Sequence, residues 1–123
     1  MSFPVQRPRR LCLNSRLRQM IREVSIAPHQ LIYPIFIVEG LKEPHEISAM
    51  PGQMHWPVDR CHEPVEAAMR RGVVAFILFG VPAQKDNDGR CASDRNSVVC
   101  AALRHIRSHC PEAYLITDVC LCA

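Results

Sequence analysis

The chain has 123 residues, of which 48% are hydrophobic and 22% charged, so one modest globular domain is expected. These shares exclude a disordered or collagen-like polymer. No apolar run approaches the roughly 20 residues of a membrane span, and the N-terminus lacks the apolar stretch of a secretory signal. The seven cysteines are an odd number without a regular framework. We therefore expect reduced thiols, mostly buried, in a cytoplasmic protein without a membrane partner.

The N-terminal region predicts an arm followed by a short helix. Residues 1–12 contain prolines and arginines and bury little, which is typical of an extended segment. Its few basic charges lack interleaved aromatics, so a solvated tail or a strap on a neighbouring subunit is favoured over nucleic-acid binding. Asn14 is a plausible N-cap for an amphipathic helix that runs to about Val24, and Pro28 closes the segment.

The next segment predicts a strand and then a long loop. Residues 31–38, LIYPIFIV, are apolar on both faces, which is typical of a strand buried on both sides. Pro34 removes a hydrogen-bond donor from the ladder, so it implies an edge, a bulge or a strand with a free side. Residues 40–57 read as a loop with a turn at Pro51-Gly52.

The remaining chain alternates helices and strands. A helix from about Glu63 or Pro64 to Arg71 is expected, with Gly72 just after its end. Residues 73–79 form a second apolar strand. Val99, Ala102, Leu103 and Ile106 mark one face of a helix that ends before Pro111, and residues 114–121 form a third strand. Buried strands that alternate with helices indicate parallel pairing and an α/β fold.

Two loop motifs resemble binding sites, but one lacks a required ligand and the other lacks the required spacing. The acidic run Asp86–Gly89 suggests a calcium loop, yet Arg95 occupies the position of the bidentate glutamate, so a turn is favoured. Gly80 and Gly89 are too far apart for a phosphate-binding glycine loop.

Two of the six histidines have a ligand-like spacing. His105 and His109 are four residues apart on a predicted helix and so have the spacing to chelate a metal, but no glutamate lies between them in the metalloprotease pattern. A position on the outer, polar face of the helix is favoured. Trp56, beside a proline, is expected to be a packed loop anchor.

The most informative stretch is the last one, ITDVCLCA. In a strand, Asp118, Cys120 and Cys122 project to the same face, at the carboxyl end where α/β folds place their chemistry. Two thiolates beside an acid make part of a soft-metal site next to a proton-transfer or amine-binding group. The alternative is a pair of buried cysteines in a core strand. A catalytic zinc site typically has three protein ligands, and only two are present.

Several segments together resemble the porphobilinogen synthase (δ-aminolevulinic acid dehydratase) family. The resemblance runs over essentially the whole chain, in order and spacing. It rests on RPRRL (7–11), LRQM-x-RE (17–23), LIYPIFIVEG (31–40), SAMPG (48–52), LFGVP (78–82), KDNDG (85–89) and TDVCLC (117–122). The last stretch is the most specific, because it resembles the D-x-C-x-C of the zinc-dependent branch.

The resemblance implies the N-terminal part of a TIM (β/α)8 barrel. Residues 1–28 would be the arm and helix that wrap a partner subunit, and residues 29–123 the first β/α units, with about three strands. The reaction implied is the condensation of two 5-aminolevulinate molecules to porphobilinogen in haem biosynthesis, by a homo-oligomer that is an octamer for the full-length family. Cys120 and Cys122 match two of three zinc ligands, and Asp118 matches an active-site acid.

The departures from the family pattern concern residues that the reaction needs. The third zinc cysteine has no counterpart within the chain, and neither Lys42 nor Lys85 matches a Schiff-base lysine. Arg90 and Pro64 are further differences. We therefore expect a truncated piece that is inactive alone. We also expect it to be marginally stable or prone to aggregate, because an incomplete barrel leaves bare edges and a half-covered apolar sheet. The alternatives are a non-catalytic assembly or regulatory module that docks on full-length subunits, and a small metal-storage or redox protein.

Overall fold

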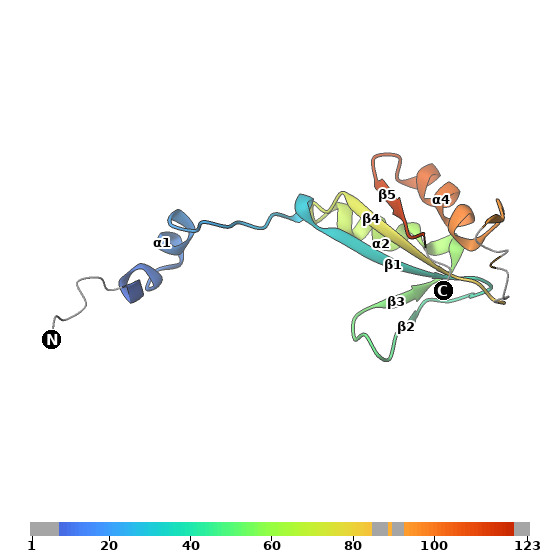
Figure 1. Cartoon of the computed structure of the whole chain (residues 1–123), viewed down its shortest axis with the longest axis horizontal. Helices are drawn as coiled ribbons and strands as arrows, with labels where there is room; N and C mark the ends of the chain where they lie inside the picture. Colours follow the sequence, from blue (N-terminus) through green and yellow to red (C-terminus); the bar gives the residue numbers. More distant parts are fainter. Residues whose placement is uncertain (1–7, 85–88, 90–92, 120–123) are drawn as a thin grey trace.

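Three parallel strands form the centre of the structure: β1 (Ile32–Val38), β4 (Ala75–Val81) and β5 (Tyr114–Thr117). The structure is a computed structural model and describes residues 8–84, 89 and 93–119. A short hairpin extends the sheet beyond β1, since β3 (Met54–Trp56) pairs parallel with β1 and β2 (His45–Glu46) pairs antiparallel with β3. The strand order is β2-β3-β1-β4-β5, and Figure 1 shows the sheet with its helices on one side.

Two helices cover one face of the parallel strands. They are α2 (His62–Met69) and α4 (Val98–His109), and they pack on each other as well as on the sheet. The strand register places Ile35 opposite Leu78, and both side chains are buried beneath these helices. The core is apolar and combines aliphatic side chains with Phe76 and two cysteines. Its buried members are Ile35, Ile37, Cys61, Val65, Phe76, Leu78, Val98, Ala102, Ile106, Cys110 and Ala113.

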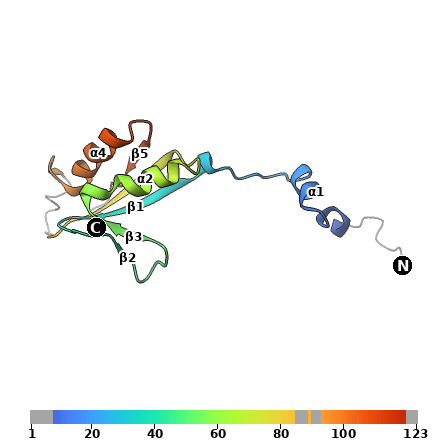
Figure 2. The same cartoon turned by 180° about the vertical axis from the view of Figure 1, so that it is seen from behind.

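The opposite face of the same strands is apolar but only partly buried. Phe36 lies opposite Phe79 in the register, and their rings stack at 5.4 Å between centroids. Ile77, Val81 and Ile116 belong to the same face by the alternation of side chains along a strand, and each of these side chains remains partly exposed. No described helix covers this side, as Figures 1 and 2 show. The expected half-covered apolar sheet is therefore present.

The helix boundaries follow from local chemistry. The Asn14 side chain accepts a hydrogen bond from the Arg16 N–H and caps α1 (Ser15–Met20), as predicted. Pro64 lies in the first turn of α2, where a missing N–H costs nothing. Gly72 follows the same helix with φ 88°, the left-handed conformation predicted for it. Ser97 caps α4 through the Cys100 N–H.

Gly80 allows α4 to approach β4 closely. A Cβ at this position would lie 2.4 Å from Val99 Cγ2 and 2.7 Å from Val98 Cγ1. Real Cβ contacts are not this short, so only glycine permits the observed packing of the helix start on the strand.

The arm extends away from the sheet. In Figure 2, α1 and the segment that leads from it to β1 extend away from the helices and strands of the body. The helix ends at Met20 rather than near Val24, and it has no buried residue. Since short helices in water depend on tertiary packing, the unpartnered apolar positions after Met20 do not extend it.

Other predictions differ from the structure in detail. The predicted loop 40–57 contains β2 and β3, which are too short to produce an alternating pattern. Pro34 lies in an interior strand, but β3 pairs only with Phe36 and Ile37, so this end of β1 has a free side. Trp56 is half-buried against the core, as expected. None of the described helices has the length and apolar character needed to cross a membrane.

Candidate functional site at the carboxyl edge of the sheet

The three parallel strands end at the same edge, and Asp118 follows β5 at that edge. Its N–H donates to the Leu78 carbonyl over 3.5 Å, which continues the parallel ladder one residue past the strand. Thr117 pairs with Leu78, whose side chain is buried on the helix-covered face, although Thr117 itself is exposed at the strand end. Alternation therefore places Asp118 on the open face with Ile116. The Asp118 side chain is exposed. It is therefore an accessible carboxylate at the mouth of an apolar, open face.

The other two residues of the predicted site lie outside the described residues. These are Cys120 and Cys122, so their shared face with Asp118 stays a prediction. The acidic loop is also outside, apart from Gly89, and so is Lys85. The structure does place Lys42, which lies in the segment after β1.

Glu39 ties the ends of β1 and β4 together at this edge. Its N–H donates to the Val81 carbonyl over 3.0 Å, and its Oε2 accepts from the Ala83 N–H over 2.9 Å. These two bonds hold the segments that follow the strands, and so fix the rim on which Asp118 lies. No local pattern predicts this role, because Glu39 and Ala83 are 44 residues apart.

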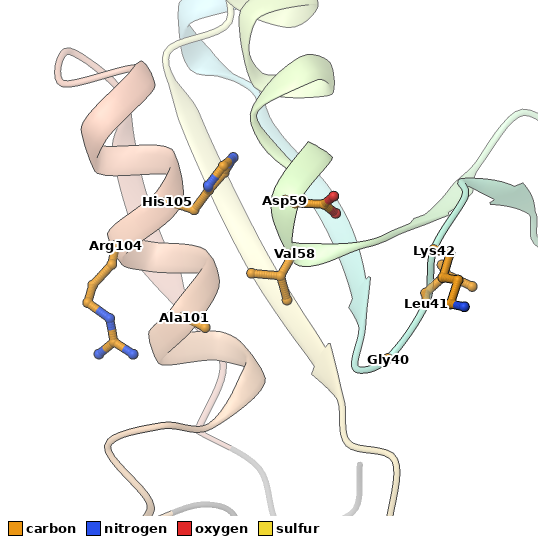
Figure 3. Close-up of a pocket in the computed structure, with 8 residues that line it drawn as sticks. All are labelled: Gly40, Leu41, Lys42, Val58, Asp59, Ala101, Arg104 and His105. Atoms are coloured by element: carbon orange, nitrogen blue, oxygen red, sulfur yellow. The ribbon is translucent and has the colours of Figure 1, made fainter.

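A wide, open pocket of about 700 Å³ lies on the helix side of the same edge. It is bordered by the segment after β1, by the 3-10 turn Val58–Arg60 and by α4. Figure 3 shows the Arg104 side chain directed away from the space between α4 and Val58. The lining residues are Gly40, Leu41, Lys42, Val58, Asp59, Ala101, Arg104 and His105.

Three histidines meet beside this pocket. The predicted pair His105 and His109 lies on α4, and His62 joins it from the first position of α2. His62 Nδ1 lies 2.9 Å from His105 Nε2. Burial lowers the pKa of His105, and the positive charges that His109 and His62 can carry lower it further. The sequence could not show this cluster, since His62 is 43 residues from His105 and only helix packing joins them.

A second histidine pair lies on the β2–β3 hairpin. His55 Nδ1 is 3.1 Å from His45 Nε2. Burial lowers the pKa of His55, and the neighbouring His45 lowers it further. With two ligand atoms rather than three, this pair is a weaker candidate for metal binding.

The two buried cysteines, Cys61 and Cys110, do not form a reactive site. Cys61 is buried and its thiol donates to the Val58 carbonyl over 3.0 Å, while burial raises its pKa to about 12. Burial also raises the pKa of Cys110. A thiol with a raised pKa is a poor nucleophile, so both residues serve as small core side chains, as predicted.

Comparison with known proteins identifies the family. The family model described as delta-aminolevulinic acid dehydratase matches residues 5–123. The chain belongs to this family. A dehydratase of this name from Archaeoglobus fulgidus is 42% identical over 120 residues, and one from Ruminiclostridium josui is 41% identical over 118 residues.

A solved structure has the same fold. The δ-aminolevulinic acid dehydratase (porphobilinogen synthase) of Toxoplasma gondii, in complex with the reaction product porphobilinogen, matches with a TM-score of 0.81 and 28% sequence identity. The match covers 98% of this chain and 35% of that one. The chain is thus an α/β unit that corresponds to part of a TIM-barrel-like dehydratase.

The chain spans only part of the length of its relatives. It covers 37% of the Archaeoglobus protein and 58% of the Ruminiclostridium protein, while 98% and 96% of this chain is matched. The five-stranded sheet described here therefore corresponds to a portion of the enzyme's fold.

Proposed function

We propose that this chain supplies the N-terminal β/α units of a porphobilinogen synthase. The reaction condenses two molecules of 5-aminolevulinate to porphobilinogen with loss of two waters, in haem biosynthesis. The observation that carries the proposal is the family match over residues 5–123, which includes an accessible carboxylate, Asp118, at the carboxyl edge of a parallel sheet. TIM-barrel enzymes place their chemistry at this edge.

Asp118 is the catalytic residue of the proposal. An exposed carboxylate on the open face has room to meet a substrate amine and to accept or hold its proton. The apolar side chains around it, Phe36, Phe79 and Ile116, exclude water once the face is covered, which strengthens the attraction between the carboxylate and an ammonium group.

Cys120 and Cys122 are proposed to hold a zinc ion together with a third cysteine from a longer chain. Two thiolates at this spacing fit the donor set of zinc, a borderline-soft ion. Zinc supplies Lewis-acid activation of a bound substrate. The Schiff-base lysines are also proposed to belong to the longer chain, because neither Lys42 nor Lys85 lies in a segment that resembles those of the family's lysines. The 123-residue chain alone is then inactive.

The arm is proposed to serve assembly. Residues 1–28 would strap a neighbouring subunit of a homo-oligomer, an octamer, in the cytoplasm, while residues 29–123 form the barrel units. Support comes from the apolar side chains that the arm leaves in solvent: Leu13 and Met20 are each 82% exposed, Ile26 is 75% and Val24 is 74%. Such exposure on one segment is typical of a contact surface.

The test of the dehydratase proposal is a chimera. Residues 5–123 replace the matching segment of the Archaeoglobus fulgidus relative, and porphobilinogen formation from 5-aminolevulinate is measured with added zinc. We expect turnover by the chimera. In Cys120→Ser/Cys122→Ser we expect loss of turnover together with loss of one equivalent of bound zinc. A folded chimera that makes no porphobilinogen, or one whose turnover is indifferent to both cysteines, contradicts the proposal.

The exposed apolar arm also favours a second function, a non-catalytic assembly module. In that case the 123-residue chain binds the full-length subunit and lowers its activity as more is added. The control is a chain with Leu13→Ser and Met20→Ser, which should no longer co-purify. Absence of binding by the unmodified chain would rule this function out.

A further inference from the structure

The three histidines beside the pocket form a second candidate metal centre, separate from the cysteine pair. Their ligand nitrogens all lie within 4.8 Å of one another. The rings are close as well: the centroids of His62 and His109 are 4.2 Å apart and those of His105 and His109 are 4.3 Å apart. The His62 and His109 rings stack at an interplanar angle of 20°, so an ion shared by the three residues would bind at nitrogens on the ring edges.

The two helices hold the ligands in place through the core. Cys61, next to His62, and Val65, one turn further along α2, are both fully buried. On α4, His105 adjoins the fully buried Ile106, and His109 lies one turn further on the same side. The backbone of each ligand is therefore fixed by packing before any ion binds, which reduces the entropy lost on binding.

A hydrogen bond determines which ring nitrogen of His109 remains available to a metal. His109 Nδ1 lies 2.8 Å from the His105 carbonyl and donates to it, so its Nε2 carries the lone pair. A metal-binding imidazole typically donates its other N–H to such a carbonyl.

The separation of the nitrogens suits a tetrahedral ion. Zinc–nitrogen bonds of about 2.0–2.1 Å at tetrahedral angles place two ligand nitrogens about 3.3 Å apart. His62 Nδ1 and His105 Nε2, at 2.9 Å, need only a small rotation to reach that separation. Three imidazoles without a carboxylate favour zinc, nickel or copper over magnesium or calcium. His109 is exposed, so a fourth position is open to water.

We propose that His62, His105 and His109 bind one divalent transition-metal ion of the zinc class. The ion joins the start of α2 to the C-terminal half of α4 on the outer surface of the helices. Its open position lies beside the pocket that His105 and Asp59 line. The proposal is independent of the dehydratase proposal, because none of these histidines belongs to the carboxyl-edge site.

The experiment measures zinc binding to the 123-residue chain that carries Cys120→Ser and Cys122→Ser, which removes the thiolate pair. Calorimetric titration in a non-chelating reductant is expected to give one equivalent of zinc and none of magnesium. Zinc should also raise the unfolding midpoint, because it binds the folded state. His109→Gln and His62→Gln are each expected to weaken binding by about tenfold or more, since even indirect partners of a metal are worth this much.

The matched control is His55→Gln, which changes an imidazole of the other pair and should leave zinc affinity unchanged. The imidazole NMR signals give a readout without a substitution: zinc should shift those of His62, His105 and His109 together. If the short chain precipitates, the same variants are made in the chimera. Absence of saturable binding at millimolar zinc, or equal affinity in the His109→Gln and His55→Gln variants, would overturn the proposal.

Discussion

The two faces of the central sheet are built from the same three strands but differ in what covers them. On one face, Phe76 and Leu78 are fully buried beneath α2 and α4. On the other, their neighbours Ile77 and Phe79 are equally apolar and remain partly exposed. The covered face holds the chain together. The open face carries Asp118 at its edge, so the proposed chemistry lies where this chain does not bury its own residues.

The largest expected effect is on the free energy of unfolding. It is measured by a matched pair of substitutions, one on each face of the sheet. Phe76→Ala should destabilise the chain by about 3–5 kcal/mol, because it leaves a cavity in the core. Phe79→Ala should cost much less, since that ring is already partly hydrated. Urea unfolding followed by circular dichroism measures both. Equal losses would mean that the open face contributes to stability as much as the covered one.

Gly80→Ala should lower the free energy of unfolding by about 1–3 kcal/mol, because it overpacks α4 against β4. Its added methyl would collide with Val99 and Val98. Val99→Ala removes one of the two colliding groups, so the double variant should lose less than the sum of the single losses. Additive losses in the same unfolding assay would show that the helix start moves freely away from the strand.

Polar substitutions on the open face should reduce self-association. Ile77→Thr and Phe79→Ser shrink the exposed apolar surface, and they leave the core beneath the helices unchanged. Light scattering of the 123-residue chain should then report smaller particles at unchanged helix content. Thr in place of the buried Leu78 is the control and should unfold the chain. Unchanged particle size in the open-face variants would place the association surface elsewhere, for example on the arm.

The smallest effect concerns an ion pair on the rim of the covered side. Arg60 donates to both carboxylate oxygens of Glu63, and this hydrogen bonding holds the pKa of Glu63 below its ordinary value of 4.5. The folded carboxyl thus binds its proton less readily than the unfolded one. Its contribution to stability is present above the unfolded pKa and is lost as the pH falls through the folded pKa.

Because solvent reaches 38% of the Arg60 side chain and 39% of the Glu63 side chain and screens the pair, we expect only a slight loss of stability in acid. The lowered pKa of Glu63 is measured by a pH titration of its carboxyl chemical shift. The Glu63 midpoint should rise toward its ordinary value in Arg60→Met and stay unchanged in Arg70→Met. A Glu63 midpoint that does not respond to Arg60→Met would contradict the assigned cause.

Apolar runs and helix-end residues made much of the fold predictable. The apolar runs around Phe36 and Phe76 predicted β1 and β4, and the caps Asn14 and Gly72 were correctly placed. The sequence could not reveal β2 and β3, since two or three residues give no alternation. It also missed the length of α1, because the spacing of apolar residues does not show whether anything packs against them.

The candidate site residues were also predictable where the signal is local in the sequence, and not where it depends on packing between distant segments. Asp118 was predicted from alternation within one strand, a local property, and its exposure at the carboxyl edge agrees with an accessible group. Its role, like those of Cys120 and Cys122, stays a prediction. The histidine cluster was only half visible, since the spacing of His105 and His109 is local whereas His62 arrives through the packing of α2 on α4. Glu39 was missed for the same reason.

The central claim is that the open face carries the chemistry and the covered face does not. The direct measurement compares adjacent residues on opposite faces, Asp118→Asn and Thr117→Val, in the chimera with the Archaeoglobus relative. Loss of a positioned acid or base typically lowers turnover by about 10²–10⁴-fold. We predict such a fall in kcat for Asp118→Asn and less than a tenfold change for Thr117→Val. Full turnover by the Asp118→Asn chimera would contradict the account.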